Sequence, residues 1–217
     1  MIDGVIFDLD GTLWDTRAVC VRAWNKVIRA SGLALPDVTA ARLTGIMGLE
    51  PHEIAERMFP GLVDETRNRL IRACYDREVD DLRTTSPEDV LYPGVAAGLA
   101  VLKDRLRLCV VSNCQTGYLD AFLTHSGVGE MIDDGECIGR TGQPKADNLR
   151  FVVGRQRLRS PLYVGDTERD ESAASEARVA FVHARYGFGN TRGEPPAVDS
   201  FDELVQLIVT RIRAASN

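Results

Sequence analysis

The sequence predicts an α/β fold in which helices cover both faces of a parallel sheet, with an all-helical segment inserted after the first strand. Two patterns support this fold class. In residues 90–217, short apolar runs bounded by turn residues alternate with stretches of helical periodicity, as in βαβ units. Residues 15–89 keep a helical periodicity and contain no convincing strand. We therefore expect a core domain of residues 1–14 and 90–217 and a helical domain of residues 15–89.

Each element follows from local signals. The apolar run Gly4–Leu9 precedes Gly11, which indicates a buried strand ending in a turn. Asp15 or Thr16 can cap the first helix, and Gly32 can end it. Further helices are expected at 39–44, 51–59 and 64–82, and a loop at 84–89. The second half is expected to contain helices at 95–103, 118–125, 148–158, 171–177 and 200–214, strands at 106–112, 161–165 and 179–183, and a loop at 187–197.

The composition is that of an ordinary globular protein, with 44% hydrophobic and 27% charged residues in a chain of 217. The net charge of −6 argues against nucleic acid as a partner. No apolar run approaches the roughly 18 to 20 residues of a membrane span, and no signal peptide is evident. Five cysteines without a CxxC pair indicate free thiols in a reducing cytoplasm, and neither disulfides nor a zinc site.

Polar side chains follow three predicted strands at the points where the strands end. They are Asp8 and Asp10 after the first strand, Ser112 and Asn113 at the second, and Asp166 and Asp170 at a later one. A lone Asp after a strand usually forms a turn or caps a helix. Several carboxylates converging at one sheet edge, however, repel one another unless a divalent cation neutralises them. Hard oxygen ligands without a cluster of His or Cys indicate Mg²⁺.

These residues resemble the motifs of the haloacid dehalogenase superfamily. The DxDGT motif of its phosphatases stands as Asp8-Leu9-Asp10-Gly11-Thr12, the strand-terminal Ser or Thr as Ser112, and the later acidic pair as Asp166 and Asp170. In order and spacing these motifs cover almost the whole chain. The resemblance implies a Rossmann-like three-layer core with a helical C1-type cap domain at residues 15–89. It points to the branch of the phosphoglycolate phosphatases and β-phosphoglucomutases.

The resemblance also implies roles for the motif residues. Asp8 would be the nucleophile that forms an aspartyl-phosphate, and Asp10 the general acid and base. Mg²⁺ would be held by Asp8, the backbone carbonyl of Asp10 and Asp166, with Asp170 acting directly, through water or by orienting a lysine. Phosphate would be bound by Gly11, Thr12, Ser112, Asn113 and Lys145. The carboxylate at position 10 favours phosphate esters, since dehalogenases of the superfamily lack one there.

The lysine motif departs from the superfamily pattern. Many relatives read GKPxPD, with the catalytic Lys directly after Gly, whereas this chain has Gln143 at that position and Lys145 two residues later. We expect Lys145 to serve as the catalytic lysine from a shifted loop. The alternative is a solvated loop lysine without a catalytic role.

The helical cap is expected to select the substrate. In relatives with such a cap, a loop between its first helices faces the core site, and here that loop is Thr44–Leu49. Its apolar, glycine-rich centre, Gly45, Ile46, Met47 and Gly48, is the expected specificity loop. An ordinary turn between helices is an equally good interpretation of the same residues.

We therefore predict an Mg²⁺-dependent phosphatase that hydrolyses a small phosphomonoester through an aspartyl-phosphate. The first alternative is a phosphomutase of the β-phosphoglucomutase kind, although Ile46, Met47 and Gly48 supply none of the basic residues that mutases usually carry there. The second is a non-catalytic phosphate-binding module, against which the complete motif set argues. The expected partner is a small phosphorylated metabolite. Its identity and the oligomeric state do not follow from the sequence.

Overall fold

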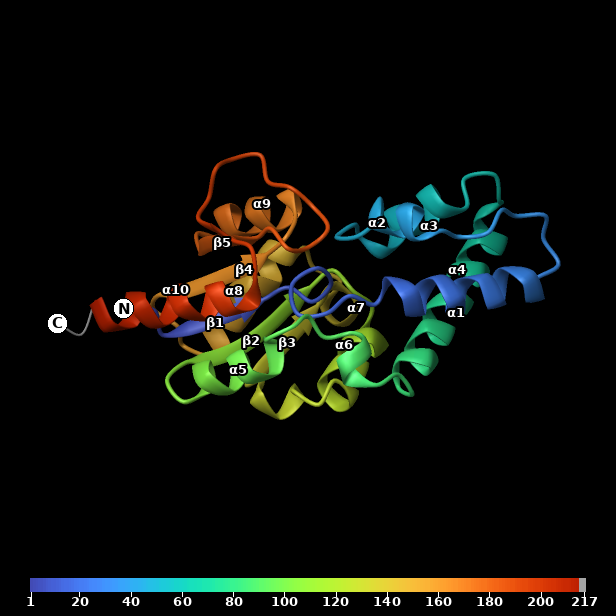
Figure 1. The fold of residues 1–217 in the computed structure, drawn as a ribbon. Helices are drawn as coiled ribbons and strands as arrows, with labels where there is room; N and C mark the ends of the chain where they lie inside the picture. Colours follow the sequence, from blue (N-terminus) through green and yellow to red (C-terminus); the bar gives the residue numbers. More distant parts are fainter. Residues whose placement is uncertain (215–217) are drawn as a thin grey trace.

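The computed structural model describes residues 1–214, and its core is a parallel sheet of six strands in the order β3-β2-β1-β4-β5-β6 (Figure 1). The strands are β1 (Gly4–Phe7), β2 (Arg107–Ser112), β3 (Asp134–Cys137), β4 (Pro161–Gly165), β5 (Ala180–Ala184) and β6 (Ala197–Val198). Phe7 lies opposite both Val110 and Val164, so β1 is hydrogen-bonded between β2 and β4. The strand order reverses at β1, and such a switch point places a ligand crevice at the carboxyl ends of these three strands.

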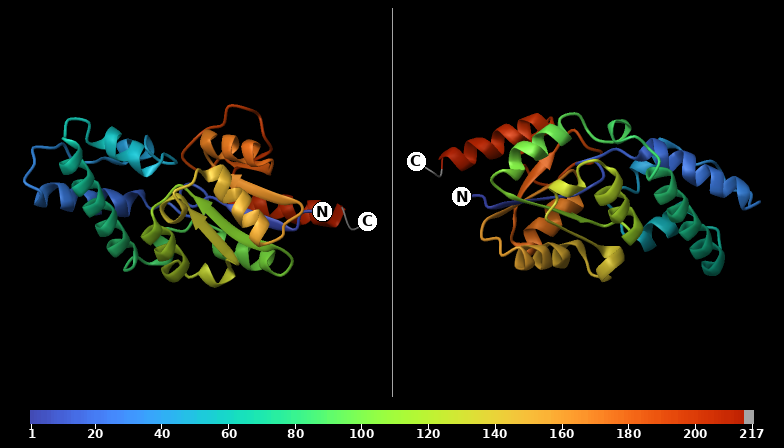
Figure 2. Two further views of the ribbon diagram at one scale, coloured as in Figure 1. Left: turned by 180° about the vertical axis from the view of Figure 1, so that it is seen from behind. Right: turned by 90° about the horizontal axis from the view of Figure 1, so that it is seen from below.

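Helices cover both faces of the sheet and complete three layers (Figure 2). Because side chains alternate along a strand, Val5 and Phe7 face one helical layer while Ile6 faces the other. The first layer contains α5 (Val95–Lys103), α6 (Thr116–His125) and α10 (Phe201–Ala214), and the second contains α8 (Lys145–Arg155) and α9 (Glu168–Ala177). The two apolar clusters between these layers fix the sheet and thereby the positions of the strand ends.

A separate helical body lies beside the sheet (Figure 1). It consists of α1 (Arg17–Ala30), α2 (Ala40–Thr44), α3 (Pro51–Met58) and α4 (Asp64–Leu82), which share an apolar cluster of their own. Two chain segments connect it to the sheet, and these segments are bonded to each other. The backbone N–H of Asp15 donates to the carbonyl of Val90 at 2.7 Å, and that of Tyr92 donates to Leu13 at 3.1 Å. The helical body is therefore attached through a paired, antiparallel connection.

The predicted fold class is confirmed, and the differences lie at element boundaries and in short elements. The helix expected at 148–158 begins at Lys145 and ends at Arg155, and the one expected at 171–177 begins at Glu168. Pro144 and the capping side chain of Thr167 begin these helices earlier than their apolar residues indicate. The expected loop at 84–89 ends in the 3₁₀ turn η1 (Pro87–Asp89).

Four short elements were not predicted: η2 (Gly129–Met131), β3, α7 (Ile138–Thr141) and β6. The strand β3 reads Asp-Gly-Glu-Cys and lies at one edge of the sheet. Two of its side chains are carboxylates that form ion pairs with Arg155, so it lacks an apolar strand pattern. All five cysteines are free thiols, and all five are buried. Within residues 1–214, no helix combines the length and apolar character needed to span a bilayer.

Candidate active site

The carboxyl ends of β1, β2 and β4 bring Asp8, Ser112 and Asp166 to one edge of the sheet. Each of these residues directly ends or follows its strand, and each is at most 4% exposed. Lys145 and Asp170 come to the same edge from the first turns of α8 and α9. The structure thus gathers the predicted strand-end residues and the predicted lysine in one buried group.

Lys145 spans two of the carboxylates. Its Nζ donates to Asp8 Oδ1 at 3.0 Å and to Asp170 Oδ1 at 2.7 Å. Burial disfavours the ammonium, but its attraction to Asp170 and Asp8 outweighs this and raises the pKa of Lys145. Gln143, the position at which relatives carry the lysine, is exposed. The structure therefore brings Lys145 rather than Gln143 to Asp8.

Asp170 is held by four donors. Its Oδ1 accepts from Lys145 and from the hydroxyl of Tyr163 at 2.9 Å, and its Oδ2 accepts from the backbone N–H of Thr167 at 3.0 Å and from the Thr167 hydroxyl. Burial raises the pKa of Asp170, but Lys145 and the hydroxyl donors outweigh it and keep that pKa below its ordinary value. The Asp170 carboxylate is thus ionised and fixed, and it orients the lysine.

Two glycines allow the chain to close around Asp166. Gly11 has a φ of +80°, and a Cβ there would lie 2.2 Å from Asp166 Oδ2. A Cβ at Gly187 would lie 2.3 Å from the carbonyl oxygen of Gly11. The next residue, Phe188, donates its backbone N–H to Asp166 Oδ2 at 2.7 Å. The loop after β5, predicted only as a surface loop, therefore packs against the site.

The residues present fit a divalent cation. Asp8, Asp166 and Asp170 each offer a carboxylate oxygen within 4.8 Å of the other two. Asp166 Oδ1 is buried and accepts no hydrogen bond from any described residue. Burial raises the pKa of Asp166 well above its ordinary value, and repulsion by Asp170 and Asp8 adds to the rise. A hard cation would accept Asp166 Oδ1 as a ligand and would offset the repulsion among the three carboxylates. Such oxygen donors suit Mg²⁺.

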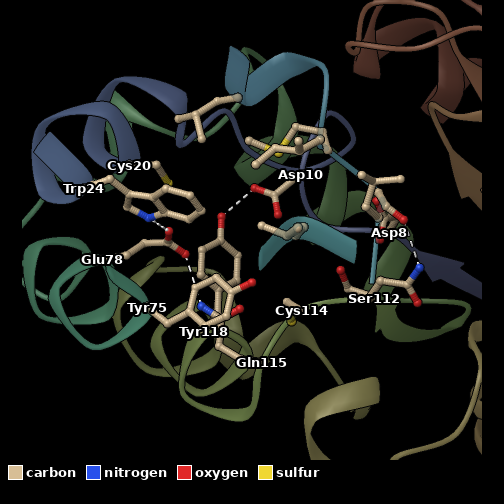
Figure 3. Close-up of a pocket in the computed structure, with 17 residues that line it drawn as sticks. Asp8, Asp10, Cys20, Trp24, Tyr75, Glu78, Ser112, Cys114, Gln115 and Tyr118 are labelled. Carbon is tan, nitrogen blue, oxygen red and sulfur yellow. Dashed lines mark hydrogen bonds between the residues drawn. The ribbon is translucent and has the colours of Figure 1, made fainter. Parts of the chain in front are cut away.

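Asp10 lies apart from this carboxylate group and faces a pocket (Figure 3). Its Oδ1 accepts from the hydroxyl of Thr16 at 3.0 Å and from that of Tyr118. Burial raises the pKa of Asp10 to about 7, against the lowering effect of the Tyr118 hydrogen bond, and repulsion by Asp8 and Glu78 adds to the rise. A carboxyl group with this pKa exchanges a proton near neutral pH, as general acid–base chemistry requires.

Several donors for a phosphate group surround Asp8. Ser112 is buried at the end of β2, and Thr12 is buried in the turn after β1, where its hydroxyl has no hydrogen-bond partner among the described residues. Asn113 lies beside Ser112 and donates its Nδ2 to the carbonyl of Gly48 at 3.0 Å. The predicted specificity loop thus touches the predicted phosphate-binding residues.

The pocket extends from the strand ends into the helical body and holds about 60 Å³ of space. In Figure 3, Asp8 and Ser112 lie at one end, Trp24, Tyr75 and Glu78 at the other, and Asp10 between them. Its other lining residues are Cys20, Leu43, Ile46, Met47, Gly48, Leu49, Ile54, Asn113, Cys114, Gln115 and Tyr118. Of the predicted specificity loop, Ile46, Met47 and Gly48 line the pocket, and Gly45 does not.

Tyr118 and Glu78 are among the groups at the site that the sequence analysis did not predict. Tyr118 stands at the start of a predicted helix, and nothing in its surroundings marks it as a partner of Asp10. Glu78 offered a signal, because Leu70, Cys74, Glu78 and Leu82 follow one another at intervals of four. Such spacing places all four on the buried face of α4, where a charged residue departs from the apolar pattern.

Comparisons with known proteins identify the family and several relatives of this chain. The family described as haloacid dehalogenase-like hydrolase matches residues 5–184. A phosphoglycolate phosphatase of Agrobacterium fabrum is 30% identical over 84% of this chain and 80% of its own. One of Rhodobacter capsulatus is 26% identical over 88% of both chains.

Solved structures agree with the fold. A protein described as a predicted phosphoglycolate phosphatase from Haemophilus somnus superposes with a TM-score of 0.82, at 21% identity over 95% of this chain and 98% of its own. A β-phosphoglucomutase from Clostridium difficile gives a TM-score of 0.75, at 18% identity over 97% and 96% of the two chains. The predicted family and enzyme class are confirmed: with the family matched from β1 to β5, this chain belongs to the haloacid dehalogenase-like hydrolases.

Proposed function

We propose that this protein is an Mg²⁺-dependent phosphatase that hydrolyses a small phosphomonoester, in the cytoplasm, through an aspartyl-phosphate on Asp8. The observation that carries this proposal is the buried group of Asp8, Lys145 and Asp170 at the strand ends, with Asp10 two residues further along the chain. The names of the curated relatives, which include phosphoglycolate phosphatases, support the reaction type.

In the first step, a carboxylate oxygen of Asp8 attacks phosphorus and the bond from phosphorus to the ester oxygen breaks. Asp10, with its pKa raised to about 7, gives its proton to the departing alcohol. Lys145 and the hydroxyl of Ser112 stabilise the charge on the phosphoryl oxygens. Asp170 acts as a positioning residue, since its hydrogen bonds hold Lys145 beside Asp8.

In the second step, water attacks the phosphorus of the aspartyl-phosphate and the bond from phosphorus to Asp8 breaks. Asp10, now ionised, takes the proton of the water, which returns both carboxylates to their starting states. Asp8, Asp166 and the backbone carbonyl of Asp10 would hold Mg²⁺. When bound, the cation neutralises the phosphoryl oxygens and the crowded carboxylates.

Hydrolysis fits this pocket better than a mutase reaction. A mutase of phosphorylated sugars must hold a second phosphate while the first is transferred. Among the described residues that line the pocket there is no Lys, Arg or His. The far end of the pocket therefore offers no cation for a second phosphate group.

The proposal is tested with a panel of phosphomonoesters, assayed for phosphate release with Mg²⁺ and after treatment with EDTA. We expect Mg²⁺-dependent turnover and its complete loss in Asp8→Asn, because an amide cannot form the acyl phosphate. Isomerisation of sugar phosphates without phosphate release would indicate a mutase. Absence of turnover across the panel, or substantial turnover by Asp8→Asn, would overturn the proposal.

A further inference from the structure

The end of the pocket far from Asp8 is an aromatic chamber with one carboxylate. We define the chamber by Trp24, Tyr75, Glu78 and Tyr118, which come from α1, α4 and α6 (Figure 3). Trp24 and Tyr75 lie edge to face, with ring centroids 5.9 Å apart. Apart from Glu78 and its hydrogen-bond donors, these rings and the surrounding aliphatic side chains make the chamber mainly apolar.

Glu78 is buried and fixed within this chamber. Its Oε2 accepts from the indole N–H of Trp24 at 2.6 Å, and its Oε1 accepts from Nε2 of Gln115 at 3.1 Å. Both donors are neutral, and no Lys, Arg or His among the described residues lies within 4.0 Å of this carboxylate. A buried carboxylate without a cationic partner is costly, so a cation supplied by a ligand would bind here favourably.

The charged side chains that line the pocket are all carboxylates. They are Asp8, Asp10 and Glu78. The arginines near the loop do not line the pocket: Arg57 donates to the carbonyl of Gly45 at 3.3 Å, and Arg17 donates to the hydroxyl of Thr44 at 3.0 Å. Arg17 is paired with Asp15 at 2.6 Å and lies over the ring of Phe188, and Arg42 donates to the carbonyl of Met58. A leaving group with a carboxylate would meet Glu78 without any cation to neutralise it. Phosphoglycolate has such a leaving group.

We propose that the substrate is the phosphomonoester of a small amino alcohol, whose ammonium group is bound by Glu78 within the aromatic chamber. This inference rests on the proposed phosphatase function. The pocket holds only about 60 Å³ from Asp8 to Glu78, so the leaving group that it accepts beside the phosphate must be small. The faces of Trp24 and the tyrosines add attraction for a cation. With phosphate at Asp8 and the ammonium at Glu78, Asp10 lies beside the ester oxygen between them.

The test compares three series of phosphate esters that differ only in the terminal group. Aminoalkyl, hydroxyalkyl and carboxyalkyl phosphates with chains of two to four carbons are assayed for kcat/KM. We expect the best aminoalkyl ester to exceed its hydroxyalkyl counterpart by about tenfold or more, as for a hydrogen bond between charged groups, and the carboxyalkyl ester to be poorest. Glu78→Gln should lower the amino-to-hydroxy ratio by about tenfold. Because the Glu78 charge also raises the pKa of Asp10, the readout is the ratio of the two esters within one variant and not the rate of either ester alone.

The matched control is Asp80→Asn, which removes one negative charge from an exposed position on the same helix. It should leave the amino-to-hydroxy ratio unchanged. Equal or greater kcat/KM for the carboxyalkyl or hydroxyalkyl series, or a ratio insensitive to Glu78→Gln, overturns the inference. Phenyl phosphate separates this failure from failure of the phosphatase function, because turnover of that ester does not depend on an ammonium group.

A binding measurement keeps the inference testable if Glu78→Gln does not fold. Calorimetry with the inactive Asp8→Asn variant and Mg²⁺ should give a Kd for the aminoalkyl phosphate at least about tenfold below that for the carboxyalkyl phosphate of equal length. Equal affinities, or tighter binding of the carboxyalkyl phosphate, would contradict the assignment.

Discussion

Lys145 neutralises a buried group whose other charged members, Asp8, Asp166 and Asp170, are carboxylates. Removing its ammonium leaves Asp8, Asp166 and Asp170 without a cation from the chain and leaves the phosphoryl oxygens without one donor. We expect Lys145→Ala to lower kcat/KM by about two orders of magnitude or more, about 3 kcal/mol, as for loss of one charge-stabilising group. Steady-state kinetics measure this loss. The variant should also have a lower Tm, because buried charges that lose their partner are strongly destabilising.

Gln143→Ala is the matched control for Lys145→Ala. Gln143 occupies the position of the lysine in the usual pattern, but its side chain is exposed and its backbone carbonyl accepts from Asn148. A truncation that keeps the backbone should leave kcat/KM and Tm unchanged. If Gln143→Ala is damaging and Lys145→Ala is silent, the role assigned to Lys145 is wrong.

Glu78 makes stability depend on pH in the unusual direction for a carboxylate. Burial raises its pKa to about 7 from an ordinary value of 4.5, although the Trp24 and Gln115 hydrogen bonds oppose the rise. The folded protein therefore binds a proton more tightly than the unfolded chain, and the free energy of unfolding falls as pH rises from about 4.5 through 7. Between pH 4 and 8, Glu78→Gln should gain about 3 kcal/mol relative to the unsubstituted protein.

Urea unfolding at several pH values measures this gain, with Asp80→Asn as the exposed control on α4. The control should show a constant difference from the unsubstituted protein across the pH range. A constant difference for Glu78→Gln as well would mean that Glu78 titrates equally in the folded and unfolded states.

At the scale of elements, the loop from α2 to α3 closes onto the core. Gly48 accepts a hydrogen bond from Asn113, and its φ of +76° turns the chain so that a Cβ would lie 3.3 Å from the Thr167 hydroxyl. Substrate bound between Asp8 and the pocket should hold this loop against the core. We expect Mg²⁺ with vanadate, a mimic of the phosphoryl group in transfer, to slow hydrogen exchange at residues 44–49, as measured by mass spectrometry.

The same experiment on Asp8→Asn shows whether the protection requires an occupied phosphate site. Unchanged exchange at residues 44–49 while residues around Asp8 and Ser112 become protected would mean that the loop does not close over the ligand. The loop after β5, which contains Phe188, would then be the next element to examine.

Elements with a continuous local signal were predicted well, and elements defined by their neighbours were not. The helix at 64–82 agrees at both ends because its charged and apolar residues alternate at helical spacing throughout. The strand β3 is a strand only because β2 lies beside it, with Cys109 opposite Asp134. Its polar residues are stabilised by Arg155 across the sheet edge, an interaction between residues far apart in sequence.

The site residues also differ in whether local sequence patterns predict them. Asp8, Ser112 and Asp166 were predicted because strand ends of a parallel sheet must converge, and because their motifs are specific. Lys145 was predicted because it lies two residues from the position of the lysine in the family pattern, whereas Lys26 and Lys103 lie within predicted helices. Glu78 and Tyr118 reach the pocket from the middle of α4 and the start of α6, so their roles depend on how the helical body docks on the sheet. Such docking is decided by packing, and the helical spacing around Glu78 marks that residue as buried without showing what it faces.

At the scale of the whole molecule, the carboxylates at the strand ends couple cation binding to stability. Mg²⁺ that binds the folded chain alone stabilises it by about 2.7 kcal/mol at a concentration one hundred times Kd. We expect a rise in Tm of roughly 5 to 10 °C in thermal scans of the metal-free protein. Asp166→Asn should remove most of this rise, whereas Asp199→Asn, an exposed carboxylate paired with Arg185, should keep it. An equal rise in both variants would place the cation elsewhere.

Because the chain has few lysines, acylation of Lys145 can report how often the catalytic centre opens to solvent. Only three lysines are present, and Lys26 and Lys103 are partly exposed, whereas the Lys145 side chain is 4% exposed and fully protonated between two carboxylates. An acylating reagent needs a free amine and a path to it, so it modifies the first two lysines and spares the third. Acylation of Lys145, read by peptide mass, therefore counts how often the catalytic centre opens to solvent, in a protein that needs no engineered label.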